Sequence, residues 1–283
     1  MTNKNKIKIA LDICMIFLFI TFFDKNFVNM KFHMLSGIIF AVFILIHMFI
    51  NRKWIISISK KLFDKKIKLR IKISYIVSFL LLISVGLIIV SGFYIILAPV
   101  NRKMFWKMVH YTFSYISIAL IGIHLGFYWK LVMNIFKKLF KLNSQSKVRS
   151  QIAKFITLII LVGGLFMIHN KNYFTMMYSG INYISQNIIV EKENEETSSQ
   201  EDHNNQSYAV VEKKSLFELV SVYGSIMSVF AIITYQADSL KGKNRVKTNT
   251  NKEIAKKMDL YKFIFFALRT LYHIQYFTNN ILI

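Results

Sequence analysis

Four histidines stand at matching places in two apolar stretches of the chain. The first stretch, HMLSGIIFAVFILIH, runs from His33 to His47, and the second, HYTFSYISIALIGIH, runs from His110 to His124. Both pairs have the same spacing of 14 residues, which ends about 40° short of four full helical turns. On a helix, the two imidazoles of each stretch would therefore share one face and lie about 21 Å apart along the axis.

These two stretches are expected to cross a membrane in the same direction, because one other apolar stretch separates them. If their histidine faces oppose each other, His33 pairs with His110 near one membrane surface. His47 then pairs with His124 near the other surface. The spacing thus predicts two separate sites, each built from two imidazoles.

Two facing imidazoles at each level indicate iron in a porphyrin more than a bare metal ion. A structural zinc site takes four protein ligands, and the two levels lie too far apart to share one ion. Haem iron needs only two axial ligands, and helical bundles commonly supply them. We therefore expect two b-type haems, each with two axial histidines, and no bare metal site.

The surroundings of the histidines fit a flat apolar ring. Three glycines within four residues of a histidine would let such a ring approach the backbone (Gly37, Gly122 and Gly126). Cations near the predicted surfaces could meet its propionates (Arg102, Lys103 and Lys107 at one level, Arg52 and Lys53 at the other). The same cations are equally expected from membrane topology alone.

A single intramembrane histidine can also serve only to hydrogen-bond a neighbouring helix. The repeated interval at matching depths favours ligation over that structural role. His169, His203 and His273 have no comparable arrangement, and we expect an interfacial, a loop and a surface residue, respectively.

The composition indicates a polytopic α-helical membrane protein. The 283 residues are 54% hydrophobic, include one proline, and have a mean hydropathy of +0.43. Apolar runs of about 20 residues recur, the length that spans a bilayer as a helix. The runs lack the alternation of a β-barrel. Six spans are predicted: Ile7–Phe23, Phe32–Ile50, Ile73–Leu97, Met104–Ile135, Phe155–Ile168 and Leu216–Tyr235.

The net charge of +23 follows the predicted topology and does not indicate nucleic-acid binding. Lysine and arginine are concentrated at 1–8, 51–72, 136–154 and 236–258, and are sparser in the alternate loops. The positive-inside rule therefore predicts that both termini are cytoplasmic. The single cysteine, Cys14, excludes an intrachain disulfide. Asp12, in the first span, is expected to snorkel or pair with Lys8.

Three segments are expected along the chain. Residues 1–139 would form a four-span di-haem bundle, and residues 140–240 two further spans. An acidic extracytoplasmic loop at about 190–213, with the sequence EKENEETSSQEDHNN, is expected to be disordered. Residues 241–283 read as a basic tail with an amphipathic helix on the inner membrane surface, where Lys262, Arg269 and His273 share one face.

Three segments carry a resemblance to a known family. HMLSGIIFAVFILIHMFINRKWI contains His33, His47, Asn51 and Trp54. VSGFYIILAP contains Ser91 and Gly92, and WKMVHYTFSYISIALIGIHLGFYW contains His110, His124, Gly126 and Trp129. Over about residues 28–135 the chain resembles the flavinylation-associated cytochromes, a family of bacterial di-haem membrane proteins. YFTMMY and FELVSVYGSIMSVFAIITY resemble the C-terminal half of longer members.

The resemblance implies electron transfer in a bacterial cytoplasmic membrane, from a quinol or another membrane donor to an external, flavin-bearing or other acceptor. Similar two-haem bundles occur in membrane subunits of formate dehydrogenases and hydrogenases. Tyr128 stands where the family often has another histidine, which puts any further role of that position in doubt. The sequence shows no catalytic motif of a soluble enzyme. A non-redox alternative stays open: a transporter subunit, sensor or scaffold.

Overall fold

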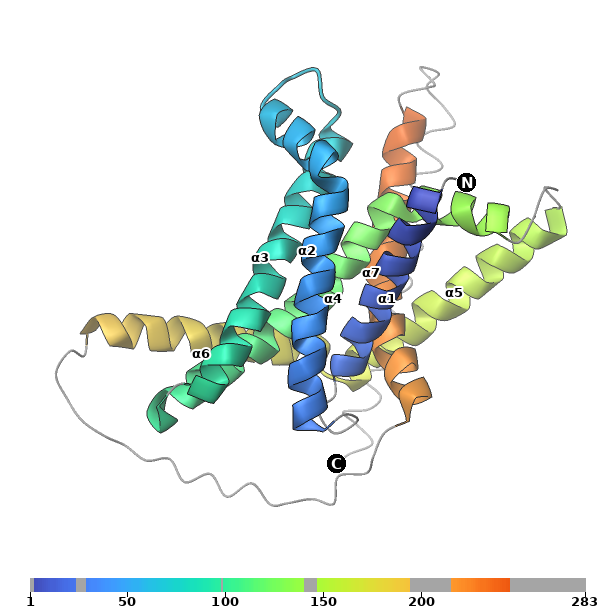
Figure 1. Cartoon of the computed structure of the whole chain (residues 1–283). Helices are drawn as coiled ribbons and strands as arrows, with labels where there is room; N and C mark the ends of the chain where they lie inside the picture. The colour runs from blue at the N-terminus through green and yellow to red at the C-terminus, as the bar shows by residue number, and fades with distance from the viewer. Residues whose placement is uncertain (1–2, 24–28, 98, 140–146, 194–214, 245–283) are drawn as a thin grey trace, which may run out of the picture. The chain divides into compact units, whose positions relative to one another are not determined.

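The computed structural model describes residues 3–23, 29–97, 99–139, 147–193 and 215–244, and all regular structure in these ranges is α-helical (Figure 1). The helices are α1 (Asn3–Phe22), α2 (Met30–Lys61), α3 (Leu69–Leu97), α4 (Val100–Leu139), α5 (Lys147–Asn170), α6 (Tyr173–Glu193) and α7 (Leu216–Asn244). The amphipathic helix expected within 241–283 and most of the acidic loop lie outside the described residues.

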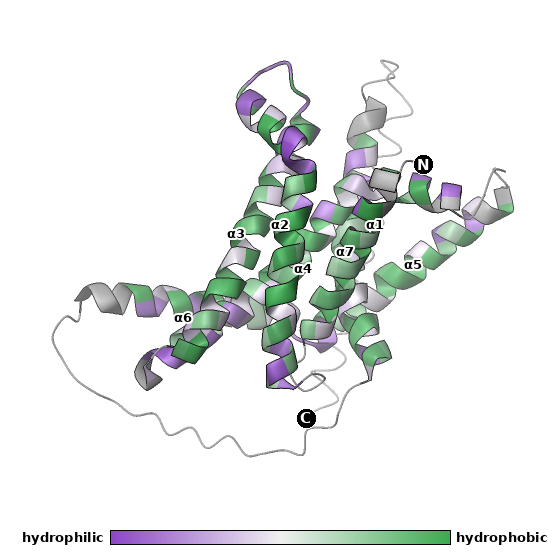
Figure 2. Ribbon diagram, viewed as in Figure 1, coloured by the Kyte–Doolittle hydropathy of each residue, from purple (hydrophilic) through white to green (hydrophobic). Residues whose placement is uncertain are grey.

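Five of these helices are long and apolar enough to cross a membrane, as expected for a multi-pass membrane protein. The candidate spans are Met30–Lys61, Leu69–Leu97, Arg102–Ile135, Ser150–Asn170 and Leu216–Leu240. Figure 2 shows the apolar middle of α2 and α3 and the polar connection between them. These five include the second to sixth predicted spans. The first, Ile7–Phe23, is helical but is not among the five, and its first half carries charged Lys8 and Asp12.

Local sequence accounts for where several helices begin. Asn29 caps α2, because its side chain accepts a hydrogen bond from the backbone N–H of Phe32 at 2.8 Å. The only proline of the chain, Pro99, stands between α3 and α4, where its missing N–H costs no helical hydrogen bond. Asn172, with a φ of 47°, adopts the left-handed conformation between α5 and α6.

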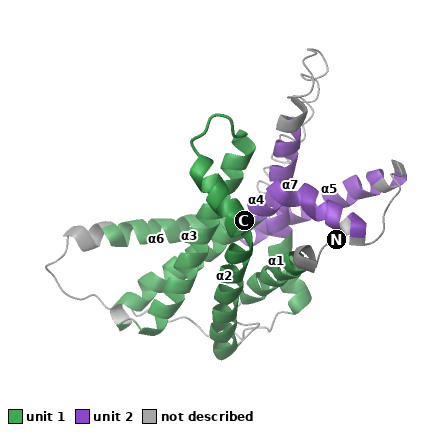
Figure 3. Ribbon diagram, turned by 45° about the horizontal axis from the view of Figure 1, so that its top comes forward, with its two compact units in different colours: residues 1–121, 172–224 green, residues 122–171, 225–283 purple. Residues whose placement is uncertain are grey.

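The chain divides into two compact units, residues 1–121 with 172–224 (unit 1) and residues 122–171 with 225–283 (unit 2) (Figure 3). Helices α4 and α7 each contribute residues to both units. The three predicted segments, 1–139, 140–240 and 241–283, stay predictions.

Side-chain contacts in unit 1 show the relative directions of its helices. The Asp12–His47 and Phe19–Phe40 contacts show that α1 runs antiparallel to α2. The short connection and the Ser59–Tyr75 hydrogen bond make α2 and α3 antiparallel neighbours.

Helix α4 runs antiparallel to α3 within unit 1. The Oγ atoms of Ser84 and Ser117 lie 2.9 Å apart, and the Tyr94 and Trp106 rings stack at 4.3 Å. Since α3 is antiparallel to both α2 and α4, the first part of α4 runs in the same direction as α2. The predicted parallel course of these two helices is thus present in unit 1.

In unit 2, helix α7 packs closely on α4 and α5 through glycines. A β-carbon at Gly126 would lie 2.7 Å from the Ala231 carbonyl oxygen of α7. One at Gly164 of α5 would lie 2.6 Å from the carbonyl oxygen of Ser225 in α7. Small residues allow such close backbone approach between membrane helices.

Gly164→Ala is expected to destabilise the protein by about 1–3 kcal/mol, because the added methyl group meets the backbone of α7. The neighbouring Gly163→Ala is the matched control, since nothing lies within 4 Å of its added carbon. Thermal unfolding in detergent, followed by circular dichroism, would compare the two variants. Equal unfolding temperatures would contradict the assigned α5–α7 packing.

Candidate functional site

The structure brings two of the four predicted histidines together. His33, near the start of α2, and His110, in α4, both belong to unit 1. Their ring centroids lie 6.1 Å apart, with ring planes inclined by 63°. Both side chains are partly buried. The spacing in the sequence predicted that His33 and His110 lie close together, and in the structure they do.

The separation of these rings can be compared with metal ligation. A metal–imidazole bond measures about 2 Å and the ring centre lies about 1 Å beyond the nitrogen, so two trans ligands place their centroids about 6 Å apart. The observed 6.1 Å agrees with that value. The two rings meet edge to face, with their planes inclined by 63°.

His110 is oriented by hydrogen bonds to α3. Its Nδ1 lies 2.9 Å from the carbonyl oxygen of Ile88 and 3.2 Å from Oγ of Ser91. A carbonyl oxygen only accepts, so Nδ1 carries the proton and Nε2 keeps its lone pair. A backbone carbonyl on one ring nitrogen is a common way to orient a histidine that binds a metal through the other.

Gly92 allows this approach of His110 to α3. A β-carbon at Gly92 would lie 3.6 Å from Cε1 and 3.7 Å from Nδ1 of His110, so any longer side chain would meet the ring. Ser91 is fully buried and donates from Oγ to the Ile88 carbonyl oxygen at 3.0 Å. Sequence reasoning found Ser91 and Gly92 only through the family resemblance.

His33 has a different environment. Its Nδ1 is buried and has no hydrogen-bond partner among the described residues. The ring contacts Phe22 edge-on, with centroids 5.9 Å apart. One turn further along α2, a β-carbon at Gly37 would meet nothing within 4 Å, and its role toward a bound ring stays a prediction. Both histidines of this pair therefore suit the predicted ligand set.

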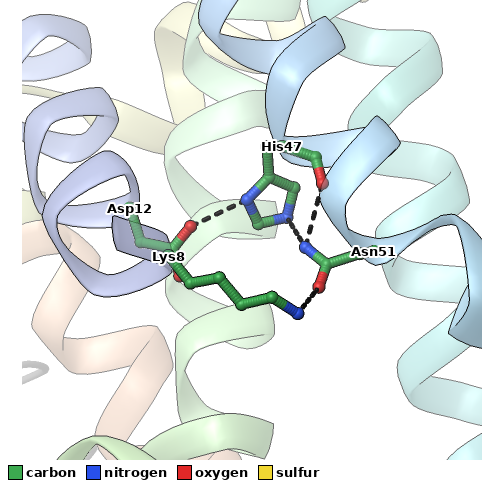
Figure 4. Close-up of polar contacts among 4 residues, drawn as sticks. All are labelled: Lys8, Asp12, His47 and Asn51. Atoms are coloured by element: carbon green, nitrogen blue, oxygen red, sulfur yellow. Dashed lines mark hydrogen bonds and ion pairs between the residues drawn. The ribbon is translucent and has the colours of Figure 1, made fainter. Parts of the chain in front are cut away.

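His47 belongs to a polar cluster between α1 and α2 (Figure 4). Its Nδ1 lies 2.7 Å from Oδ1 of Asp12. Its Nε2 lies 3.3 Å from Nδ2 of Asn51, which also donates to the His47 carbonyl oxygen at 3.0 Å. With the Asp12 carboxylate as acceptor, Nδ1 carries the proton and Nε2 presents its lone pair.

Lys8 completes this cluster, because its Nζ donates to Oδ1 of Asn51 at 2.8 Å. From the sequence, Asp12 was expected to snorkel or to pair with Lys8, and not to contact His47. The sequence did contain a sign of this contact, because a carboxylate in an apolar stretch needs a polar partner. An antiparallel hairpin of the first two helices places residue 12 opposite residue 47.

His124 lies in the part of α4 that belongs to unit 2, whereas His47 lies in unit 1. It is partly buried, and its ring centroid lies 4.9 Å from that of Tyr128. The pairing of His47 with His124 stays a prediction. His169 is partly buried in α5, and His203 and His273 lie outside the described residues.

The expectation that Gly122 and Gly126 open a path to a bound ring is wrong in this structure. The space beside each is filled by α7: a β-carbon at Gly122 would lie 2.8 Å from Cβ of Phe230, and one at Gly126 2.6 Å from Cβ of Thr234. Sequence alone does not distinguish a glycine that admits a ligand from one that admits a helix.

The predicted propionate partners lie largely at the surface. Arg52, Lys53, Arg102 and Lys107 are exposed and Lys103 is partly buried. The Arg52 guanidinium lies 4.3 Å from the centre of the Phe49 ring. A role for any of them toward a bound ring stays a prediction.

Within the ranges that the structure describes, no three His, Cys, Asp or Glu side chains come together in a way that could hold a metal ion. The His33–His110 pair offers two ligands, half the set of a structural zinc. Comparison of the chain with models of protein families, with curated proteins and with solved structures yields no match.

Gly92→Leu is expected to lower stability by about 1–3 kcal/mol, because its side chain would displace the His110 ring from Ile88. Gly86→Leu on the same helix is the matched control, since a β-carbon there meets nothing within 4 Å. Thermal unfolding in detergent measures both. A Gly92 variant as stable as its control would contradict the close His110–α3 contact.

Proposed function

We propose that the protein is a di-haem b-type cytochrome that carries electrons across a membrane. The observation that carries the proposal is the His33–His110 pair, whose 6.1 Å centroid separation suits two axial ligands of one iron. The Nδ1–H of His110 is directed to a backbone carbonyl, so that Nε2 is left for the metal.

His47 offers the same chemistry at the second predicted site. Asp12 accepts from its Nδ1, an arrangement that raises the basicity of a ligating imidazole and holds its ring. Under the proposal, His47 and His124 would hold the second haem, as their spacing in the sequence predicts. His33 with His110 and His47 with His124 then form two sites about 21 Å apart along the helices.

Bound haem would supply reversible one-electron chemistry, while the protein supplies ligation, burial and spacing. The apolar helices exclude water and shield the rings from solvent. The polar partners Ile88, Ser91 and Asp12 fix the orientation of the imidazoles. These polar partners belong to α1 and α3, and the histidines that they would orient belong to α2 and α4.

The resemblance to flavinylation-associated cytochromes extends the proposal to the partners. A quinol or another membrane donor would deliver electrons, and a flavin-bearing or other external acceptor would take them. By the positive-inside rule, the basic loops would orient the chain with both termini in the cytoplasm of a bacterial cell. The protein would then be an electron-transfer component of a membrane oxidoreductase.

The purified protein is expected to show a b-type absorption spectrum and about two haems per chain in a pyridine assay. Double variants test the pairing: His33→Ala with His110→Ala should keep one haem, whereas His33→Ala with His124→Ala should keep none. His169→Ala is the control and should keep both. A folded but colourless protein would favour the non-redox alternative of a transporter subunit, sensor or scaffold.

Asp12→Asn is expected to raise the midpoint potential of one haem by tens of millivolts, because a weaker acceptor makes His47 a poorer electron donor to ferric iron. Asp12→Glu, which keeps the carboxylate, should restore most of the original value. Optical redox titration of the reconstituted protein measures both haems. A shift confined to the haem that His110→Ala removes would contradict the assignment of Asp12.

A further inference from the structure

Helix α6 differs from the candidate spans in both composition and course. Its 21 residues, Tyr173–Glu193, are not among the helices apolar enough to cross a membrane. Within unit 1 it runs across the direction of α2 in both views (Figures 1 and 3). None of the spans predicted from the sequence covers it, because the fifth ends at Ile168 and the sixth begins at Leu216.

One face of α6 packs on α4. Tyr173 is fully buried, and its hydroxyl donates to the carbonyl oxygen of Tyr115. Burial raises the pKa of Tyr173, so the phenol stays protonated and remains a donor. Two turns along, Gly180 is buried and a β-carbon there would overlap the Thr112 side chain. Residues at this helical spacing form the protein-facing side of α6 (Tyr173, Met177, Gly180, Ile184 and Asn187).

The next face of α6 is apolar and exposed. Phe174, Tyr178, Ile181 and Ile188 are 53%, 70%, 44% and 49% exposed, respectively. Steps of four, three and seven residues place them in one stripe beside the buried face. This exposed stripe is apolar except for Ser185, and it indicates a surface that another apolar phase covers.

A third face of α6 is polar and exposed. Thr175, Ser179, Asn182 and Gln186 follow each other at steps of four, three and four residues. Around the helix, the apolar stripe therefore lies between the buried face and this polar stripe. A boundary between an apolar and an aqueous phase would satisfy both stripes at once.

The chain itself places α6 near a membrane surface. The candidate span Ser150–Asn170 ends three residues before Tyr173. Three residues reach at most about 11 Å even when fully extended. The start of α6 therefore lies close to the depth at which α5 leaves the apolar layer.

We propose that α6 is an interfacial helix that lies in the membrane surface, with its apolar stripe in the acyl–headgroup boundary and its polar stripe in water. Such helices bury their apolar face about 5–10 Å into that boundary. A lipid surface fits better than a protein partner, because the crosswise course, the neighbouring span end and the adjacent polar stripe all match a planar boundary. The proposal does not depend on haem.

Through its buried face, α6 also connects the membrane surface to the helix that carries His110. Thr112 and Tyr115, which α6 contacts, lie two and five residues beyond this histidine.

Spin labels at single cysteines would test this placement in the full-length protein in vesicles of phosphatidylglycerol and phosphatidylethanolamine. Cys14→Ser removes the one native cysteine. Ile181→Cys and Asn182→Cys are adjacent positions on different stripes, and Ile188→Cys and Gln186→Cys form a second matched pair. Collision of the label with oxygen, which concentrates in lipid, is compared with collision with a water-soluble nickel chelate. The unfolding temperature of each labelled protein establishes that it is folded.

Labels at 181 and 188 are expected to favour oxygen over the chelate, with at least a fivefold higher ratio of collision rates than labels at 182 and 186. Equal, chelate-dominated collisions at all four positions would place α6 in water and overturn the proposal. Labels at 181 and 188 shielded from both reagents would assign the apolar stripe to a protein partner and also overturn it. Either outcome leaves the haem assay unaffected, so the two proposals can fail separately.

Discussion

The contact between His110 and α3 is the interaction on which the candidate site depends. The imidazole reaches a backbone carbonyl of a neighbouring helix beside Gly92, where a side chain larger than a methyl group would meet the ring. The buried Ser91 adds a second polar atom beside Nδ1. The ring is thereby held in one tautomer and faces His33 of α2. Without this contact, His33 and His110 would still lie close together, but the orientation of the His110 ring would not be fixed.

Polar pairs of this kind set the register throughout unit 1. An apolar helix can slide along another at little cost, because most of its surface is chemically uniform. A hydrogen bond between Ser84 and Ser117, or between Asp12 and His47, restricts that sliding to one position. In membrane proteins each such bond contributes about 0.6 kcal/mol on average, so several together are needed to specify the arrangement. Glycines serve the same purpose in unit 2, where they allow the backbone of α7 to approach α4 and α5.

Part of the candidate site was predictable from individual residues. The 14-residue intervals place His33 and His110 at corresponding points of parallel helices, and the structure has these two side chains together. The contact of Asp12 with His47 could also have been predicted from an antiparallel pairing of the first two helices. The pairs Lys8–Asn51, Asp12–His47 and Phe19–Phe40 all follow one such register. Gly122 and Gly126 were interpreted wrongly, because a missing side chain does not reveal what occupies the space.

The sequence by itself determined that the chain forms apolar helices of membrane-crossing length and that its histidines recur at equal intervals on them. These properties are local: they depend on hydropathy and helical period within one segment. Only the tertiary structure decided which atoms bind each imidazole, which glycines admit a neighbouring helix, and which face of α6 is buried. Those features depend on the register between segments far apart in sequence, which follows from the fit of many side chains at once.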